Sequence, residues 1–400
     1  MTEDITKLPT INVGIVGHID HGKTTLLYKL SGKWADTHSE ELKRGITIKL
    51  GYADTIIKKE NNIYTSNPES KGEPLRYITF VDAPGHEMLM ATMLSGAAIM
   101  DAAILVISAS EGIKPQTKEH LIALQAKKIN QVIIVQNKID LVTKEQALES
   151  YKKIKEFVKG TIAENSPIIP VSAQQNINLE KILEELCKIK IPERNTTDKP
   201  IFFVARSFDI NRPGTEINKL HGGVLGGALK QGKLKIGDEI EIKPGYSYKK
   251  QNQYFYQNIK SKIVSMQKGN HPITEATPGG SLAIETELDT NLTKADSLSG
   301  CILSTPDNLP EIKSEIKIKF ELFKDVLGSE KSEQVQPLKP TELLMLSINT
   351  TTSVGQVKKI KAKEVELALK IPIVPLKGES IGLARNISGH WRLIGFGEII

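Results

Sequence analysis

A phosphate-binding loop is predicted at 17–25, where the chain reads GHIDHGKTT. Gly17, Gly22, Lys23 and Thr24 complete the pattern G-x-x-x-x-G-K-[ST], between an apolar strand-like run and a helical segment. The glycines let backbone N–H groups converge on phosphates, and the helix N-terminus adds its dipole. Lys23 would reach the β- and γ-phosphates of a bound nucleotide, and Thr24 would give its hydroxyl to Mg²⁺.

A carboxylate inside this loop, Asp20, calls for an explanation because it would repel a triphosphate. Two alternatives stay open. In the first, Asp20 braces the loop by accepting hydrogen bonds from its own backbone. In the second, a further Mg²⁺ bridges Asp20, the carbonyl of Gly45 and the phosphates, so that either one or two Mg²⁺ ions are bound.

A base-recognition loop is predicted at Asn137, Lys138 and Asp140, in the sequence NKID after a strand. The Asp140 carboxylate can accept hydrogen bonds from N1–H and the exocyclic amine of guanine. Adenine lacks that donor pair and would leave a charge unpaired. Asn137 would brace the loop and contact the base, and the stem of Lys138 would pack on the face of the base.

A second base contact is predicted at Ser172-Ala173-Gln174, where the N–H of Ala173 would reach O6 of guanine. The three motifs in this order indicate a GTPase that binds GTP and GDP. The residues assigned to the nucleotide are Gly17, Asp20, His21, Gly22, Lys23, Thr24, Thr25, Gly85, Asn137, Lys138, Asp140, Ser172, Ala173 and Gln174.

Two further segments are predicted to sense the γ-phosphate. Asp82 begins the pattern D-x-x-G and would hold Mg²⁺ through a water molecule, while the N–H of Gly85 would touch the phosphate. Thr47, in KRGITI, would complete the Mg²⁺ shell only while that phosphate is present. Loss of the γ-phosphate would release both segments. The assignment of Thr47 depends mainly on the resemblance described below.

His86, directly after Gly85, is the candidate that orients the attacking water, and Lys23 is the second catalytic candidate. An imidazole with an ordinary pKa near neutrality suits that task. Ile19 and Ile46 are predicted to form an apolar gate that keeps His86 away until a partner triggers hydrolysis.

The first half of the chain alternates short apolar runs with helix-like segments, which predicts a mainly parallel sheet with helices on both faces. Ligands bind at the carboxyl ends of such strands. After a linker at 188–202 the helical signal fades, and strand-like runs between Pro and Gly turns predict two small β-barrels. The predicted domains are 1–197 for nucleotide binding, 198–309 for the first barrel and 310–400 for the second.

Composition narrows the class of protein. Hydrophobic residues at 39% and charged residues at 25% are typical of a globular protein, and the formal net charge of +6 is compatible with an RNA partner. Cys187 and Cys301 are isolated, which argues against disulfides and cysteine-based zinc sites. With no apolar run long enough to span a membrane and no signal peptide, we expect a cytoplasmic protein without membrane contacts.

The motifs resemble those of the translational GTPases related to elongation factor Tu. Longer stretches resemble the gamma-subunit family of archaeal and eukaryotic initiation factor 2, over nearly the whole chain. They include HSEELKRGITIKLGYA at 38–53, DAPGHEMLMATMLSGAAIMD at 82–101 and HGGVLGGALKQGKLKIGDEIEIKPG at 221–245. The stretch ARSFDINRPGT at 205–215 is the most specific to this family.

The resemblance implies a GTP-dependent carrier of methionylated initiator tRNA to the small ribosomal subunit, which hydrolyses GTP on triggering. It also implies alpha and beta subunits as partners, beta on the nucleotide-binding domain and alpha on the first barrel. One alternative is an elongation factor-type GTPase that carries another aminoacyl-tRNA. Another is a nucleotide-binding scaffold with vestigial hydrolysis.

In one segment the chain departs from the family, which commonly carries a four-cysteine zinc knuckle between the switch segments. The corresponding insert, 58–77, contains neither cysteine nor histidine. We therefore expect no zinc there and a polar loop in its place.

Overall fold

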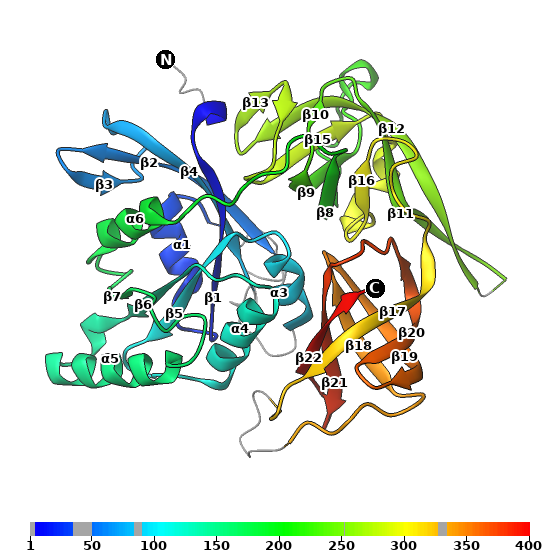
Figure 1. The fold of residues 1–400 in the computed structure, drawn as a ribbon. Helices are drawn as coiled ribbons and strands as arrows, with labels where there is room; N and C mark the ends of the chain where they lie inside the picture. The colour runs from blue at the N-terminus through cyan, green and yellow to red at the C-terminus, as the bar shows by residue number, and fades with distance from the viewer. Residues whose placement is uncertain (1–4, 35–49, 84–89, 252, 327–333) are drawn as a thin grey trace. The chain divides into compact units, whose positions relative to one another are not determined.

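The structure is a computed structural model, and it describes residues 5–34, 50–83, 90–251, 253–326 and 334–400. The chain forms a nucleotide-binding-type α/β sheet followed by two six-stranded antiparallel β-barrels (Figure 1). This agrees with the predicted fold class. The chain divides into two compact units. The first comprises Met1–Pro192, Leu322–Pro337 and Gly382–Phe396, and the second comprises Glu193–Glu321, Leu338–Ile381 and Gly397–Ile400.

The α/β sheet has seven strands in the order β3-β2-β4-β1-β5-β6-β7. The five strands from β4 to β7 in this order are parallel, and β2 runs antiparallel to β4. The carboxyl ends of the parallel strands therefore share one edge. The strands are β1 (Thr10–Gly17), β2 (Gly51–Glu60), β3 (Ile63–Thr65), β4 (Glu73–Asp82), β5 (Ala102–Ser108), β6 (Val132–Asn137) and β7 (Ile168–Pro170).

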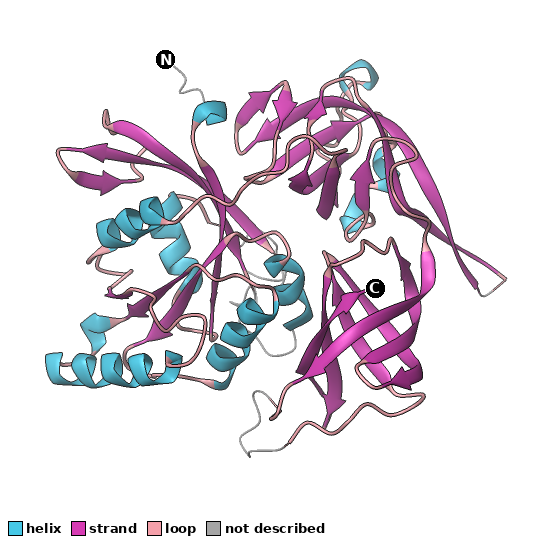
Figure 2. Ribbon diagram, viewed as in Figure 1, coloured by secondary structure: helices cyan, strands magenta, loops and turns pink. Residues whose placement is uncertain are grey.

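Helices lie on both faces of this sheet, with α1 and α6 in contact on one side and α3 and α4 in contact on the other (Figures 1 and 2). The strands β1, β5 and β6 are buried along their whole length, as expected for β-branched runs covered on two faces. The helices are α1 (Lys23–Ser31), α3 (Met90–Ala97), α4 (Pro115–Ala126), α5 (Lys144–Val158) and α6 (Leu179–Lys188), with short 3-10 turns η1 (Ile5–Lys7) and η3 (Ile139–Leu141).

The expectation of a polar loop at 58–77 was wrong for most of that segment. Strand β2 continues to Glu60, β3 pairs with it, and β4 begins at Glu73, so only the turn at 61–62 and the connection at 66–72 lie outside strands. The buried ammonium of Lys58 donates hydrogen bonds to the carbonyls of Pro68 and Ser70, both at 3.0 Å. These bonds fasten the connection to the sheet.

The first barrel closes through pairing of β11 with β12, and a small strand β13 (His271–Ile273) extends beyond β12. Its core is apolar and contains Phe202, Ile242 and Leu303. The six barrel strands are β8 (Ile201–Phe208), β9 (Val224–Gln231), β11 (Glu239–Lys250), β12 (Gln253–Lys268), β15 (Leu282–Thr286) and β16 (Ile302–Ser304). The remaining elements are β10 (Leu234–Lys235), β14 (Glu275–Ala276), η4 (Ile217–Lys219), η5 (Thr290–Leu292) and η6 (Lys294–Asp296).

The second barrel is a closed ring in the order β17-β20-β19-β18-β21-β22. Closure leaves no free strand edge among these six strands. They are β17 (Lys313–Leu322), β18 (Leu343–Ile348), β19 (Thr351–Lys361), β20 (Glu364–Ile373), β21 (Ser380–Ile387) and β22 (His390–Ile399).

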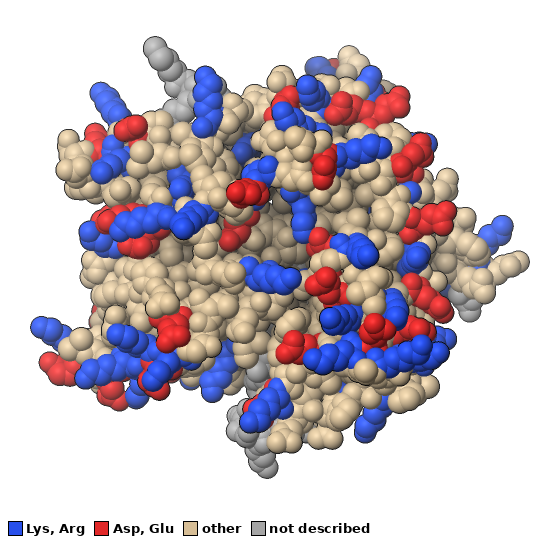
Figure 3. Space-filling view, in the orientation of Figure 1, with Lys and Arg blue, Asp and Glu red and all other residues tan. Residues whose placement is uncertain are grey.

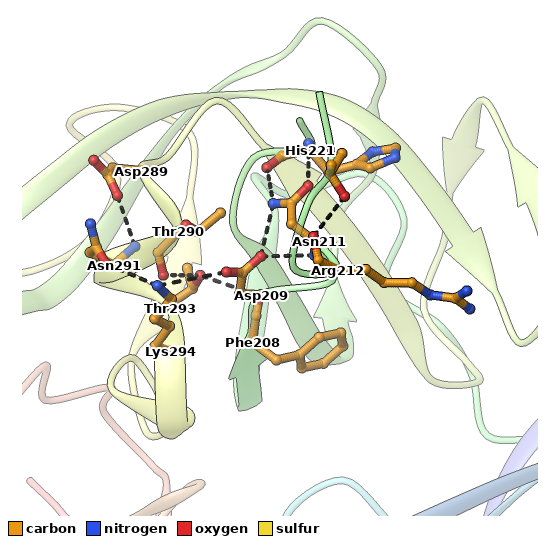
Figure 4. Close-up of polar contacts among 11 residues, drawn as sticks. Phe208, Asp209, Asn211, Arg212, His221, Asp289, Thr290, Asn291, Thr293 and Lys294 are labelled. Atoms are coloured by element: carbon orange, nitrogen blue, oxygen red, sulfur yellow. Dashed lines mark hydrogen bonds and ion pairs between the residues drawn. The ribbon is translucent and has the colours of Figure 1, made fainter. Parts of the chain in front are cut away.

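The stretch 205–215 comprises the end of β8 and the loop that follows it (Figure 4). The Asp209 carboxylate accepts hydrogen bonds from the backbone and side chain of Asn211, at 2.9 and 2.8 Å. The backbone N–H of Asn211 is the main group that lowers the pKa of Asp209. Asn211 in turn exchanges two hydrogen bonds of 2.8 Å with the backbone of His221. Thr293, from the loop after β15, donates to the carbonyl of Phe208 at 3.2 Å.

Charged side chains are spread over the face of the molecule seen in Figure 3, where lysines and arginines alternate with aspartates and glutamates. No described helix has both the length and the apolar character needed to cross a membrane.

Candidate nucleotide-binding site

The loop between β1 and α1 has a backbone that only particular residues can adopt. Gly17 and Gly22 have φ of +141° and +88°. A Cβ on Gly17 would lie 2.3 Å from the carbonyl oxygen of Val106, and one on Gly22 would lie 2.4 Å from Nδ2 of Asn137. Both glycines are therefore required by conformation and by space. Asp20 also has positive φ, 60°, which aspartate tolerates better than most residues.

Lys23, predicted to contact phosphate, and Thr24, predicted to contact Mg²⁺, lie at the start of α1. The ammonium of Lys23 donates a hydrogen bond to the carbonyl of His18 at 2.8 Å and therefore lies across the loop. The hydroxyl of Thr24 donates to Oδ2 of Asp82 at 3.2 Å. Asp82 is fully buried at the end of β4, and in the sheet it lies beside Ile15 of β1. The sheet thus brings together two groups that lie 58 residues apart in the sequence.

Asn137 connects the phosphate loop with both base-recognition stretches. Its Nδ2 donates to the carbonyl of His21 at 2.9 Å, and its Oδ1 accepts from the N–H of Ala173 at 3.1 Å. The side chain is 2% exposed at the end of β6. The side-chain amide of Asn137 therefore ties together three segments, namely the phosphate loop, the end of β6 and the stretch that contains Ala173.

The remaining base-loop residues lie beside Asn137. Lys138 has φ of 63°, and its ammonium forms an ion pair with Glu111 at 3.2 Å. Asp140 lies in η3 with an exposed side chain. Ser172 is buried, and its hydroxyl accepts from the N–H of Gln175 at 3.2 Å. Gln174 is exposed.

Two histidines of the phosphate loop are held in an environment that disfavours their charged forms. Burial lowers the pKa of His21 to about 4, and its Nδ1 donates to the carbonyl of Val106 at 3.3 Å. Burial also lowers the pKa of His18, whose ring meets that of His21 edge to face at 5.0 Å. At neutral pH both rings are uncharged, so neither adds positive charge to the loop.

Sequence reasoning missed two residues that support the site, His120 and Glu111. His120, on α4, accepts a hydrogen bond at Nδ1 from the N–H of Gly17 at 2.8 Å. Glu111 precedes α4 and holds Lys138. Neither belongs to a contiguous motif. The only signal in the sequence is a polar residue at a position of α4 that faces the sheet.

Several predicted residues lie outside the described part of the chain. They are Gly45, Ile46, Thr47, Gly85 and His86. Ile19 and Thr25 are described, and both are half-buried. Within the described residues there is no cluster of three or more His, Cys, Asp or Glu side chains able to hold a metal ion.

Comparison with known protein families agrees with a nucleotide-binding site in the α/β sheet. Residues 8–192 match the model of the elongation factor Tu GTP-binding domain, and residues 314–399 match that of the initiation factor eIF2 gamma C-terminal domain. The sheet, its phosphate loop and the two barrels thus define a translational GTPase that hydrolyses GTP.

The curated relatives narrow this class further. The chain is 51% identical to the translation initiation factor 2 subunit gamma of Methanococcus maripaludis, and the match covers 98% of each chain. It is 47% identical to that of Pyrococcus furiosus, again over 98% of both chains. The chain therefore belongs to the gamma-subunit family of translation initiation factor 2.

A solved structure with the same fold is a bacterial selenocysteine-specific elongation factor, with a TM-score of 0.76 and 25% identity. That match covers 98% of this chain and 58% of the elongation factor. The SelB elongation factor of Methanococcus maripaludis with a GTP analogue has a TM-score of 0.73 at 24% identity, which supports the fold alone.

Proposed function

We propose that this chain carries methionylated initiator tRNA to the small ribosomal subunit while GTP is bound, and releases it after hydrolysis. It would be the core subunit of a heterotrimeric factor, with a beta subunit on the nucleotide-binding domain and an alpha subunit on the first barrel. The domains we propose are 1–197, 198–309 and 310–400. The observation that carries the proposal is identity of about half over nearly the full length of initiation-factor gamma subunits.

For the phosphates, we propose Lys23, Thr24 and Asp82 as the principal residues. The ammonium of Lys23 already lies across the loop, where an anionic group would replace the carbonyl of His18 as its partner. The hydroxyl of Thr24 and the carboxylate of Asp82 lie 3.2 Å apart, and hard oxygen groups of this kind fit Mg²⁺, the hydroxyl directly and the carboxylate through a water molecule. When bound, Mg²⁺ would neutralise charge on the β- and γ-phosphates.

For the base, we propose that Asp140 pairs with the N1–H and the amine of guanine, and that Ala173 donates its N–H to O6. Asn137 holds the phosphate loop and Ala173 together through its two hydrogen bonds, so base and phosphate contacts form as one unit. The ion pair with Glu111 would hold the Lys138 stem for packing on the face of the base. Adenine would be rejected because it lacks this pair of donors and would leave the Asp140 carboxylate unpaired against the base.

For the switch, we propose that Thr47 and Gly85 sense the γ-phosphate and that His86 orients the attacking water. Ile19 and Ile46 would gate His86. Of these five residues only Ile19 is described. The carboxylate of Asp20 is exposed. Two roles stay open for it, a brace of the loop backbone or a ligand of a second Mg²⁺ together with the Gly45 carbonyl.

Filter binding of charged initiator and elongator tRNAs tests the carrier function. The protein is loaded with GTP or GDP, and each state is measured with and without alpha subunit. We expect the GTP form to retain initiator tRNA more tightly than elongator tRNA, and the GDP form to retain neither. Equal affinity of the GTP form for both tRNAs would contradict the initiator assignment and favour a general aminoacyl-tRNA carrier.

A further inference from the structure

His120 is a buried polar residue that no sequence motif includes. It lies on α4, 1% exposed, and its Nδ1 accepts the hydrogen bond from the N–H of Gly17 at 2.8 Å. The two residues are 103 positions apart in the sequence. The contact thus joins a helix on one face of the sheet to the first residue of the phosphate loop.

The N–H of Gly17 lies at the point where the chain leaves β1. Strand pairing with β5 ends there, at Val106, and the chain turns with φ of +141°. A buried backbone N–H without an acceptor would destabilise the folded state, so this donor needs a partner. His120 supplies that acceptor, and its ring thereby defines the direction in which the loop starts.

The imidazole can do this only when Nδ1 carries no proton. Burial lowers the pKa of His120 to about 3, and the neighbouring Lys23 and His18 act in the same direction. The ring is therefore neutral at physiological pH, with its proton on Nε2, and Nδ1 is free to accept. A cationic ring would lose the bond to Gly17 and would also repel Lys23.

The segment that carries His120 also reaches the base loop. The N–H of Ala109, at the start of the segment, donates to the carbonyl of Asn137 at 2.7 Å. Glu111, two residues on, holds Lys138. Residues 109–120 therefore contact the phosphate loop at one end and the base loop at the other.

We propose that His120 is a positioning residue of the nucleotide site, which sets how long GDP and GTP remain bound by fixing the start of the phosphate loop through Gly17. The inference depends on the proposed nucleotide site at 17–25, but it assigns a role to a residue outside every nucleotide motif. Without the acceptor, the Gly17 peptide would reorient, and the amides that follow it would no longer converge on the phosphates.

The test measures dissociation of a fluorescent GDP from the full-length protein by stopped flow. His120→Leu keeps the bulk of the ring but removes the acceptor, and we expect GDP to dissociate roughly 10-fold faster or more. His120→Asn places an amide oxygen near the position of Nδ1, and dissociation should return to within about threefold of the wild type. Leu124→Ala, which truncates another buried side chain of α4, is the matched control.

Comparing His120→Leu with Leu124→Ala separates a positioning role of His120 from a purely structural one. Leu124→Ala should lower the melting temperature without changing the GDP dissociation rate. Unchanged dissociation in folded His120→Leu would overturn the proposal, and so would a change equal to that in Leu124→Ala. Failure of the wild-type protein to bind GDP at all would instead contradict the proposed nucleotide site.

Discussion

At the residue scale, Asp140 offers the most direct test of base recognition. Its exposed carboxylate lies in η3, directly after the strand that carries Asn137. In Asp140→Asn the side chain would donate as well as accept. It should then pair with xanthine, which has a carbonyl where guanine has an amine. GTP affinity should fall roughly 100-fold or more, and xanthosine triphosphate should become the preferred ligand in competition binding.

Glu145→Gln is the matched control for this change, because it neutralises a carboxylate in the first turn of α5, five residues further on. It should leave the preference for GTP unchanged. If Asp140→Asn also kept the wild-type preference, the base-recognition loop would have to be placed elsewhere.

The buried His120 predicts a loss of stability in mild acid. Its pKa is about 3 in the folded protein and 6.5 in an unfolded chain, so below pH 6.5 only the unfolded state gains the proton. The contribution of this group to the free energy of unfolding should therefore be constant above that pH and fall as pH drops towards 3, by at most about 1.4 kcal/mol per pH unit. His21, with a pKa of about 4, contributes with the same sign.

Urea unfolding at pH 7.5, 6 and 5 measures this effect. His120→Asn cannot take up the proton, so its unfolding free energy should fall less steeply than that of the wild type over this range. Identical slopes for the two proteins would show that His120 titrates normally in the folded state.

The sequence predicts those site residues whose role depends on neighbours within one short motif. Gly22, Lys23 and Thr24 are recognisable because a phosphate loop needs them at consecutive positions. His120 could not be found in this way, because packing of α4 against β1 brings it to Gly17 from 103 residues away. A polar residue on the face of a helix that packs on a sheet is the one signal, and it does not show which backbone group the side chain contacts.

At the scale of elements, the connection between β3 and β4 depends on one buried ammonium. Lys58, 6% exposed, holds the carbonyls of Pro68 and Ser70. Lys58→Met would leave both acceptors without this donor, and the connection at 66–72 should exchange its amide hydrogens at least about 10-fold faster. Because the fastening group is an ammonium rather than a metal, EDTA should not change this exchange in the wild-type protein.

Lys71→Met makes the same chemical change at an exposed position of this connection and is the control. Hydrogen exchange followed by mass spectrometry should show no effect for it. Equal protection at 66–72 in Lys58→Met and the wild type would mean that the strand pairing alone orders the segment.

The elements also show where sequence patterns fail. Helix α6, Leu179–Lys188, has apolar positions that recur at helical spacing, which is the pattern that marks a helix in a sequence. The end of β2, all of β3 and the start of β4 were missed. In β2 the buried positions include Thr55 and Lys58, so the alternation of apolar and polar residues that marks a half-buried strand is hidden. Polar residues that are buried because they have partners cannot be recognised before the partners are known.

At the scale of the whole molecule, charge does little to identify an RNA partner. The chain has 53 basic and 47 acidic residues, and both signs are interspersed over the face shown in Figure 3. Contacts with phosphates add affinity that falls with salt but is the same for every tRNA. If the chain distinguishes initiator from other tRNAs, the distinction must come from short-range contacts rather than from its overall charge.

This predicts how tRNA selection depends on salt. Filter binding of the GTP-bound protein at 50, 100 and 200 mM KCl should show both tRNA affinities falling, while their ratio stays constant within about threefold. The reason is that the number of counterions released on binding depends on the number of phosphates that the protein contacts. Two tRNAs of the same shape offer the same number of phosphates. A ratio that collapses towards one as salt rises would show instead that long-range charge carries the discrimination, and the short-range contacts would then contribute only affinity.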